Sequence, residues 1–274
     1  MNPLSGAWAA TDALQLVVWI HAVAVLLTAA EYLHDRRDFG ERGAMSWKVF
    51  RASGSGAYRT LVPEGIQRRL FGLRGMTAML WIQIGAVLVF AVAPARSWLQ
   101  WCGLLTSTVV LLLITARQRY GQDGADQMNL IVGITCVIVF GPFQSETVMT
   151  IGLWFLALQV TLAYLSAGIA KVISPVWRKG LAVGMVVDTA SYGSRSAGDL
   201  LRRYSWIGRV LTWGTIAFEL VFVIALIAPP PVTLGILAAG VLFHLGIAFV
   251  MGLNNFVPAF LSTYPAVLFA ASQH

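Results

Sequence analysis

The sequence predicts an all-α fold, a polytopic bundle of about eight transmembrane helices. Its 274 residues are 58% hydrophobic and only 11% charged, with a mean hydropathy of +0.74. Soluble domains usually contain about 45–50% apolar and about 25% charged residues. Apolar runs of about 20 residues, the length that crosses a bilayer as a helix, recur along nearly the whole chain. We therefore expect a single transmembrane domain over residues 1–274.

Eight apolar segments are candidates for the spans. They lie near residues 13–33, 75–95, 98–117, 127–144, 147–172, 206–228, 232–252 and 255–272. No Lys or Arg precedes the first segment, so it lacks the basic start of a cleaved signal and is expected to stay as a span. Consecutive prolines cannot continue a helix, so Pro229–Pro231 should separate the sixth and seventh spans. Pro258 and Pro265 should break the eighth.

Two long polar segments, near 34–74 and 173–205, interrupt the spans. The first carries nine basic residues, namely Arg36, Arg37, Arg42, Lys48, Arg51, Arg59, Arg68, Arg69 and Arg74. The second carries five, namely Arg178, Lys179, Arg195, Arg202 and Arg203. Leucines and an isoleucine beside some of them predict short interfacial helices; these are Ile66, Leu70, Leu73, Leu200 and Leu201.

The basic residues also predict the orientation. With eight spans, all but one of the 19 Lys and Arg residues fall on the side of the two long segments, and only Arg96 lies opposite. Basic loops stay in the cytoplasm. We therefore expect a multi-pass protein of the cell (inner) membrane with both termini outside. The net charge of +7 then fits a surface beside anionic lipid, with no nucleic acid partner.

The most informative segment runs from Tyr164 to Gly180. Lys171 stands at the end of the fifth span, and a lysine inside a bilayer costs about 2.5–3.5 kcal/mol unless it reaches the interface. A partly dry amine has a lowered pKa and can act as a base near neutral pH. Tyr164, Ala167, Gly168 and Lys171 share one helical face, where the small residues admit a neighbouring helix. Lys171 is either a functional base or a residue that snorkels to the interface.

Other polar groups lie within or beside the spans. His21, Glu219 and His244 lie inside spans, and each either ties helices together or belongs to a functional site. Glu219 is expected to pair with a histidine or with Lys171, and both Glu219 and His244 should face the bundle interior. Asp123 and Asp126, at the start of the fourth span, are either helix caps or part of the same site as Lys171.

Two further features have a structural interpretation. Asn254 and Asn255 favour a turn first and a site second. Cys102 and Cys136 have no metal-ligand spacing, so they are expected to be apolar fillers, with a disulfide as the alternative. The sequence has no Walker loop, no G-x-S-x-G, no H-E-x-x-H and no dinucleotide fingerprint, and gives no support to a hydrolase or a nucleotide-driven pump.

These residues together resemble a known family. The stretch with Gly168, Lys171, Trp177 and Gly180 is similar to the hallmark of HTTM-domain proteins, which include the vitamin K-dependent gamma-glutamyl carboxylase. Further matches are the 123–127 cluster, Glu219, and Phe243–His244 leading to Asn254 and Phe256. In size the chain is closest to small bacterial members, one of which matures a secreted sporulation-delaying peptide toxin.

The resemblance implies a chemistry. In the carboxylase, the lysine matching Lys171 deprotonates a reduced quinone, and oxygen then turns the quinone into a strong base. That base abstracts a proton from a glutamate side chain, and carbon dioxide adds to the carbanion. Here it implies Lys171 as base, with three further catalytic residues, Glu219, His244 and Asp126. Residues around a reduced quinone, menaquinol or vitamin K-like, would be Tyr164, Gly168, Trp177, Gln127 and Asn254.

The sequence departs from the carboxylase in three ways. Asp126 or Gln127 stands about where that enzyme has its catalytic histidine. No counterpart of its large lumenal domain is expected, and the charge count places Lys171 on the cytoplasmic side instead of the lumenal side. Three hypotheses follow: a quinol-linked membrane enzyme that modifies or matures a peptide, a non-catalytic factor for peptide export or maturation with a companion protein, and a small transporter.

Overall fold

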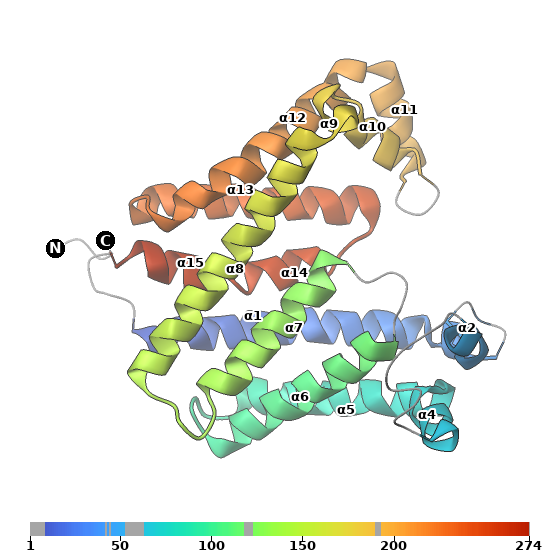
Figure 1. Cartoon of the computed structure of the whole chain (residues 1–274), viewed down its shortest axis with the longest axis vertical. Coiled ribbons are helices and arrows are strands. Elements are labelled where there is room, and N and C mark those ends of the chain that lie inside the picture. The colour runs from blue at the N-terminus through green and yellow to red at the C-terminus, as the bar shows by residue number, and fades with distance from the viewer. Residues whose placement is uncertain are drawn as a thin grey trace. The chain divides into compact units, whose positions relative to one another are not determined.

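The computed structural model describes residues 9–41, 43, 45–52, 63–117, 123–189 and 193–273, and in these residues it is helical without a β-strand. Arg42 and Arg59, two of the basic residues of the first polar segment, lie outside the described residues. Six helices are long and apolar enough to cross a membrane (Figure 1), and they are α1 (Ala10–His34), α5 (Leu73–Val92), α6 (Trp98–Arg117), α8 (Glu146–Ile173), α12 continued by η2 (Ser205–Val221 and Phe222–Leu226), and α13 (Pro230–Met251). They coincide with six of the eight predicted spans, and they indicate a membrane-embedded protein.

The fourth and eighth predicted spans correspond to shorter apolar helices. The fourth is α7 (Gly124–Val139), and the eighth is divided into α14 (Phe256–Leu261) and α15 (Tyr264–Ala271). At the break, the Ser262 hydroxyl donates to the carbonyl of Ala259 at 2.6 Å, and the Thr263 hydroxyl donates to that of Phe260 at 2.7 Å. These bonds satisfy carbonyls that an interrupted helix leaves open. The break expected from the prolines is therefore present.

The three prolines also act as expected. Pro229 is the N-cap of α13, and Pro230 and Pro231 occupy its first turn, where a missing N–H costs nothing. The hydroxyl of Thr233 donates to the carbonyls of Ala225 at 3.0 Å and Ala228 at 3.2 Å. The end of η2 is thus fixed to the beginning of α13.

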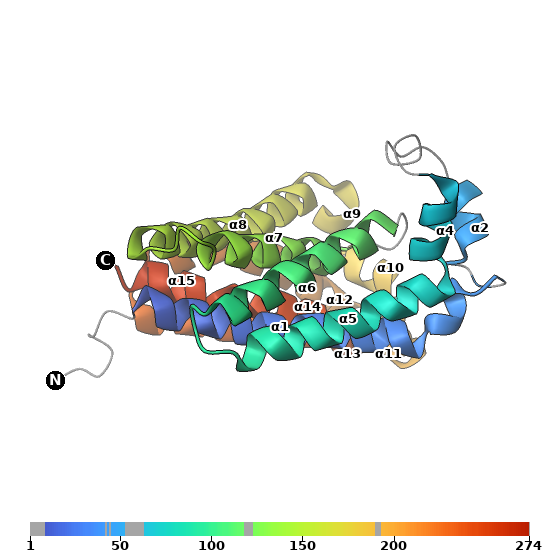
Figure 2. The ribbon, with the colours of Figure 1, turned by 90° about the horizontal axis from the view of Figure 1, so that it is seen from below.

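The chain forms two compact units, and the first to be described comprises Val18–Gln144. In it α5 lies beside α6, and α6 packs against α7 (Figures 1 and 2). Gly103 permits the close approach of α5 and α6, because a Cβ atom there would lie 2.9 Å from the backbone nitrogen of Phe90. Arg117, at the end of α6, is buried and donates to the carbonyls of Met45 and Phe71. It thereby ties the polar segment to the helices.

In the described part of this unit's polar segment there are three short helices. They are η1 (Arg36–Phe39), α2 (Trp47–Ala52) and α4 (Glu64–Phe71). Phe39, Phe50 and Phe71 enter a core with Met76 and Leu80 of α5. The amphipathic helix expected around Ile66 is therefore α4, which buries Phe71 and leaves Ile66 exposed.

The second unit comprises Met1–Val17 and Ser145–His274. Within it α8 packs against α12 and α15, and α13 contacts α14, α15 and η2. Three short helices, α9 (Pro175–Arg178), α10 (Ala182–Val187) and α11 (Arg195–Arg203), form the second polar segment. Helix α8 is the central element of this unit, and its last turns carry the residues that the sequence singled out.

Candidate functional site

Lys171 forms an ion pair with Glu219. Its Nζ atom lies 2.8 Å from Oε1 of Glu219, and the two side chains are 20% and 6% exposed. Gly168, one turn earlier on α8, makes this possible, because a Cβ atom there would lie 2.9 Å from Leu220 Cδ2 and 3.2 Å from Glu219 Cβ. Helix α12 can therefore approach α8 closely. The pairing expected from the sequence is present, and the lysine keeps a path to the surface.

Trp177 completes the surroundings of the lysine. The Nζ atom of Lys171 lies 5.0 Å from the centroid of the Trp177 ring, a cation–π distance. Pro175 at the first position of α9 starts the turn that carries this ring, and Gly180 ends it with a φ of 71°. Gly180 lies against Arg209 of α12, and the backbone N–H of Val183 donates to the Thr212 hydroxyl of α12 at 3.3 Å. The segment Trp177–Gly180 is thus fixed to α12.

A second polar group lies seven residues before Lys171 on the same face of α8. The hydroxyl of Tyr164 is 2.6 Å from Nε2 of His244 and 2.9 Å from the hydroxyl of Tyr264. All three side chains are buried, and they come from α8, α13 and α15. Gly240 leaves room for the Tyr264 hydroxyl, since a Cβ atom there would lie only 2.1 Å from it. The site therefore joins four helices when Glu219 of α12 is included.

Aromatic rings surround this polar group. Phe222 and Phe260 lie with their ring centroids 4.1 Å and 5.5 Å from that of Tyr164, and Phe260 also lies 4.5 Å from His244. Phe256 stacks on His244 at 5.9 Å. Rings of this kind exclude water and strengthen the hydrogen bonds between the polar groups that they enclose.

Two polar atoms of the site have no hydrogen-bond partner among the residues that the structure describes. They are Oε2 of Glu219 and Nδ1 of His244, and both residues are buried, as expected for groups facing the bundle interior. Buried polar atoms nearly always have a partner, so these two are open to water or to a bound group, as are His21 Nδ1 and Gln83 Oε1 in the other unit. Together with Lys171 and Tyr164, these atoms give the site proton donors and acceptors at its rim and in its interior.

The remaining predicted residues lie elsewhere. Asn254 is exposed in the turn between α13 and α14, which fits its expected structural role. Asp126 and Gln127 belong to the unit Val18–Gln144. There Asp123 caps α7, accepting from the N–H groups of Ala125 at 2.9 Å and Asp126 at 3.1 Å, while Asp126 accepts from the N–H of Asp123. This is a capping box, the structural one of the two interpretations that the sequence allowed. Gln127 is exposed.

Asp126 has an unusual pKa. Burial is the main cause that raises the pKa of this carboxyl to about 6, and the charges of Asp123 and Glu31 raise it further. The hydrogen bond from the Asp123 backbone acts in the opposite direction. Burial therefore favours the protonated form of Asp126, although its geometry is that of a cap.

The unit Val18–Gln144 also contains a buried polar cluster that sequence reasoning largely missed. His21 of α1 hydrogen-bonds with Asn129 of α7, and Gln83 of α5 donates to the Ser107 hydroxyl of α6 at 2.6 Å. Gln83 and Ser107 were missed from the sequence, because amides and hydroxyls in apolar segments carry no charge signal. Tyr264 was likewise missed. Its signal was a polar run, Ser262 to Tyr264, inside an apolar helix.

Two structural observations concern the cysteines and metal binding. Cys102 is exposed and Cys136 is buried, and both are free thiols, so the alternative of a disulfide is wrong. Among the described residues, no group of His, Cys, Asp and Glu side chains could hold a metal ion.

Comparisons with protein-family models, with curated proteins and with solved structures give no match to this chain. The geometry of the site therefore carries the functional argument.

Proposed function

We propose that the protein is an integral membrane enzyme of the HTTM type that modifies or matures a peptide with the help of a reduced quinone. In this proposal Lys171 is the general base. The observation that carries it is the pair between Lys171 and the buried Glu219, 2.8 Å apart, at the end of a face that also holds Tyr164. A lysine that is partly exposed and paired with a buried carboxylate is placed to exchange protons with a bound molecule.

The residues present fit a quinone head group. Oε2 of Glu219 and Nδ1 of His244 offer open hydrogen-bonding positions, and the aromatic rings around Tyr164 offer apolar contacts. A reduced quinone, menaquinol or a vitamin K-like molecule, supplies an acidic phenolic hydroxyl and two reducing electrons. Gly168 and Trp177 shape the lysine end of the site, and Tyr164 and His244 orient polar groups at the interior end.

The protonation of Lys171 depends on Glu219. Paired with a carboxylate, the amine is an ammonium and cannot act as a base. Transfer of its proton to Oε1 of Glu219, over 2.8 Å, leaves a neutral amine and a neutral carboxyl group. In this proposal Glu219 is therefore the proton acceptor that sets Lys171 free to act.

Substitutions of Lys171 test the base role. Lys171→Ala should abolish activity in the cell's own peptide-maturation assay even when activity is normalised to the amount of folded protein, because this variant also leaves Glu219 without its partner. Lys171→Arg should fail as well, because a guanidinium cannot be deprotonated at working pH. A purely structural lysine gives the opposite pattern, since arginine can still pair with Glu219. Near-normal function of Lys171→Arg would exclude the base role.

Lipid extraction tests the cofactor. Gently purified protein should yield a quinone on extraction and mass spectrometry, and added quinol should raise its melting temperature. Glu219→Gln, which keeps the shape of the side chain, serves as the matched variant and should weaken that shift. Recovery of bulk phospholipid alone, with no effect of added quinol, would remove the cofactor from the proposal.

The topology is part of the proposal. The two shorter helices α7 and α14–α15 complete eight spans, both termini face outside the cell membrane, and the segments 34–74 and 173–205 face the cytoplasm. Single cysteines at Ser55 and Ser196 should resist a membrane-impermeant thiol reagent in intact cells; Ser55 lies outside the described residues. Labelling of both without lysis would overturn the orientation.

A second candidate is a non-catalytic membrane factor that helps a companion protein to export or mature a small secreted peptide. The same ion pair favours it, because Lys171 and Glu219 neutralise one another and tie α8 to α12. The arginine variant separates the two candidates. A small transporter is the third candidate, and only the broken helix α14–α15 favours it. None of these candidate functions involves nucleic acid.

A further inference from the structure

Three exposed cations gather around the turn at Gly180. Arg178 and Lys179 precede this glycine directly, and the Cβ and Cγ atoms of Arg209 would lie within 3.3 Å of a Cβ atom placed on it. The turn is fixed to α12, since Gly180 lies against Arg209 and the backbone N–H of Val183 donates to the Thr212 hydroxyl. Arg178, Lys179 and Arg209, here called the Gly180 cluster, are therefore held close together by the backbone.

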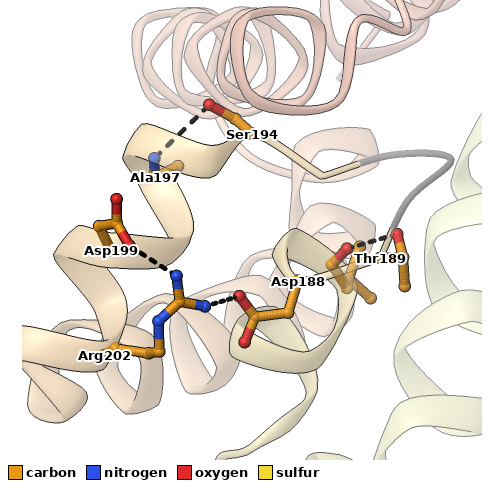
Figure 3. A network of polar contacts seen from close by, with 7 residues as sticks. Asp188, Thr189, Ser194, Ala197, Asp199 and Arg202 are labelled. Atoms are coloured by element: carbon orange, nitrogen blue, oxygen red, sulfur yellow. Dashed lines mark hydrogen bonds and ion pairs between the residues drawn. The ribbon is translucent and has the colours of Figure 1, made fainter.

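The acidic residues nearby are committed to other partners. Residues 171–219 contain three, Asp188, Asp199 and Glu219. Glu219 pairs with Lys171, and the other two both pair with Arg202, Asp199 at 2.6 Å (Figure 3). Gly198 permits this arrangement, because a Cβ atom there would lie 2.7 Å from Oδ1 of Asp188. Arg202 is thus neutralised, whereas the Gly180 cluster has no acidic residue left in this stretch.

The other acidic residues of the unit lie far away. Glu146 is in the first turn of α8, about 37 Å from Lys171 at the rise of an α-helix. Asp12 is in the first turn of α1, next to Thr11, whose hydroxyl bonds Met149 of α8. Both therefore belong to the opposite end of α8, so among the described residues of this unit no acidic side chain remains to compensate the positive charge of the Gly180 cluster.

Exposed apolar side chains border the cluster. Ile173 ends α8, Val176 lies in α9, and Leu181 follows Gly180, and all three are exposed. A soluble anion would gain nothing from these side chains. A phospholipid satisfies both features, because its phosphate can meet the cations while its acyl chains cover the apolar groups. Basic pockets beside membrane helices bind anionic head groups in this way.

We propose that the Gly180 cluster is a specific binding site for an anionic phospholipid. The head-group phosphate contacts Arg178, Lys179 and Arg209, and the acyl chains lie along Ile173 and Leu181. The lipid would then hold the turn that carries Trp177 against Lys171. This site is separate from the proposed quinone chemistry, and it stands whether or not the protein is an enzyme.

Lipid titration of the full chain tests the site. Detergent-solubilised protein is titrated with dioleoyl-phosphatidylglycerol or dioleoyl-phosphatidylcholine and followed by native mass spectrometry. The wild type should bind the phosphatidylglycerol at least tenfold more tightly, and inorganic phosphate should not compete at millimolar concentration. Replacing all three cations by glutamine should weaken phosphatidylglycerol binding on the order of a hundredfold, which is about fivefold for each cation.

Control variants distinguish a site from diffuse charge. Lys179→Gln should weaken phosphatidylglycerol binding about fivefold. Arg202→Gln removes the same charge from a neutralised position, and it should weaken binding less than twofold. An equal loss in both would overturn the proposal, as would a triple variant that binds like the wild type. If the triple variant does not fold, the triple variant Arg178→Lys, Lys179→Arg and Arg209→Lys, which keeps all three charges, is used to test the site. That variant should retain most of the binding, and its failure would also overturn the site.

Discussion

Both units bury polar side chains among apolar helices, but they do so in different ways. In the unit Val18–Gln144 the buried cluster consists of a histidine, amides and hydroxyls, such as His21, Gln83 and Ser107. In the other unit the buried groups include an ion pair, and one member, Lys171, is 20% exposed. One cluster is closed and lacks Asp, Glu, Lys and Arg side chains, whereas the other contains charges and reaches the surface.

This difference indicates which cluster ties helices together and which one can perform chemistry. Interhelical bonds between neutral groups stabilise membrane proteins by about 0.6 kcal/mol on average and need no access to solvent. A buried carboxylate is costly and is retained mainly where a function uses it. We therefore assign a packing role to His21, Gln83 and Ser107, and a functional role to Lys171, Glu219 and Tyr164.

The largest expected effect follows from breaking the ion pair. Glu219→Leu leaves the ammonium of Lys171 without its partner, and removing one member of a buried pair typically costs about 3–5 kcal/mol. We expect a value near the lower end, because Lys171 is partly exposed. The free energy of unfolding in detergent, from denaturant titration, measures the loss.

The double variant Lys171→Met/Glu219→Leu is the control for this prediction. It removes both charges and leaves no unpaired group, so it should be more stable than Glu219→Leu alone. If the double variant is the less stable of the two, the pair does not have the energetic role assigned to it.

A smaller effect should follow from filling the space beside Tyr264. Gly240→Ala places a Cβ atom 2.1 Å from the Tyr264 hydroxyl, and the displacement of this ring should cost about 1–3 kcal/mol. Gly235→Ala, in the same helix and with nothing within 4 Å, should be neutral or slightly stabilising. Adding Tyr264→Phe to Gly240→Ala should recover part of the loss, and no recovery would show that the hydroxyl is not the obstacle.

The stability of the unit Val18–Gln144 should depend on pH because of Asp126. Burial raises the pKa of this carboxyl from 3.8 to about 6, so the folded chain favours the protonated form. The contribution of Asp126 to the free energy of unfolding is fully present below about pH 4. It is lost as the pH rises through about 6. We expect a loss of about 1–2 kcal/mol between these values, since the carboxyl is partly solvated. Asp126→Asn should flatten this part of the stability profile, and an unchanged slope would assign the titration to another group.

Much of the fold was predictable because the bilayer constrains a sequence so strongly. Six predicted spans agree with helices long enough to cross a membrane, and the prolines at 229–231, 258 and 265 mark helix boundaries as expected. The pairing of Lys171 with Glu219 was also foreseen, since few charges lie within the spans. Local chemistry at Asp123 and Asp126 allowed a helix cap as one of two interpretations, and the structure shows a capping box there.

The parts that could not be predicted depend on contacts between distant residues. Hydropathy gives no warning that Tyr164 meets both His244 and Tyr264, because tyrosine is common in apolar helices. The need for Gly240 appears only when the Tyr264 hydroxyl is placed beside it. Span length was also uncertain where α7 ends at Val139, several residues before the predicted end at 144.

The smallest expected effect is the coupling energy of a neutral pair in the unit Val18–Gln144, and it can be compared directly with the coupling energy of the ion pair in the other unit. A double-mutant cycle with Gln83→Leu and Ser107→Ala should give a coupling energy of about 0.6 kcal/mol, because the 2.6 Å bond joins two neutral groups. The corresponding cycle for Lys171→Met and Glu219→Leu should give a coupling several times larger, because its single variants each leave a buried charge. Equal couplings in the two cycles would mean that the ion pair is only another helix tie. That result would remove the energetic distinction on which the assignment of a functional site to Lys171 and Glu219 is based.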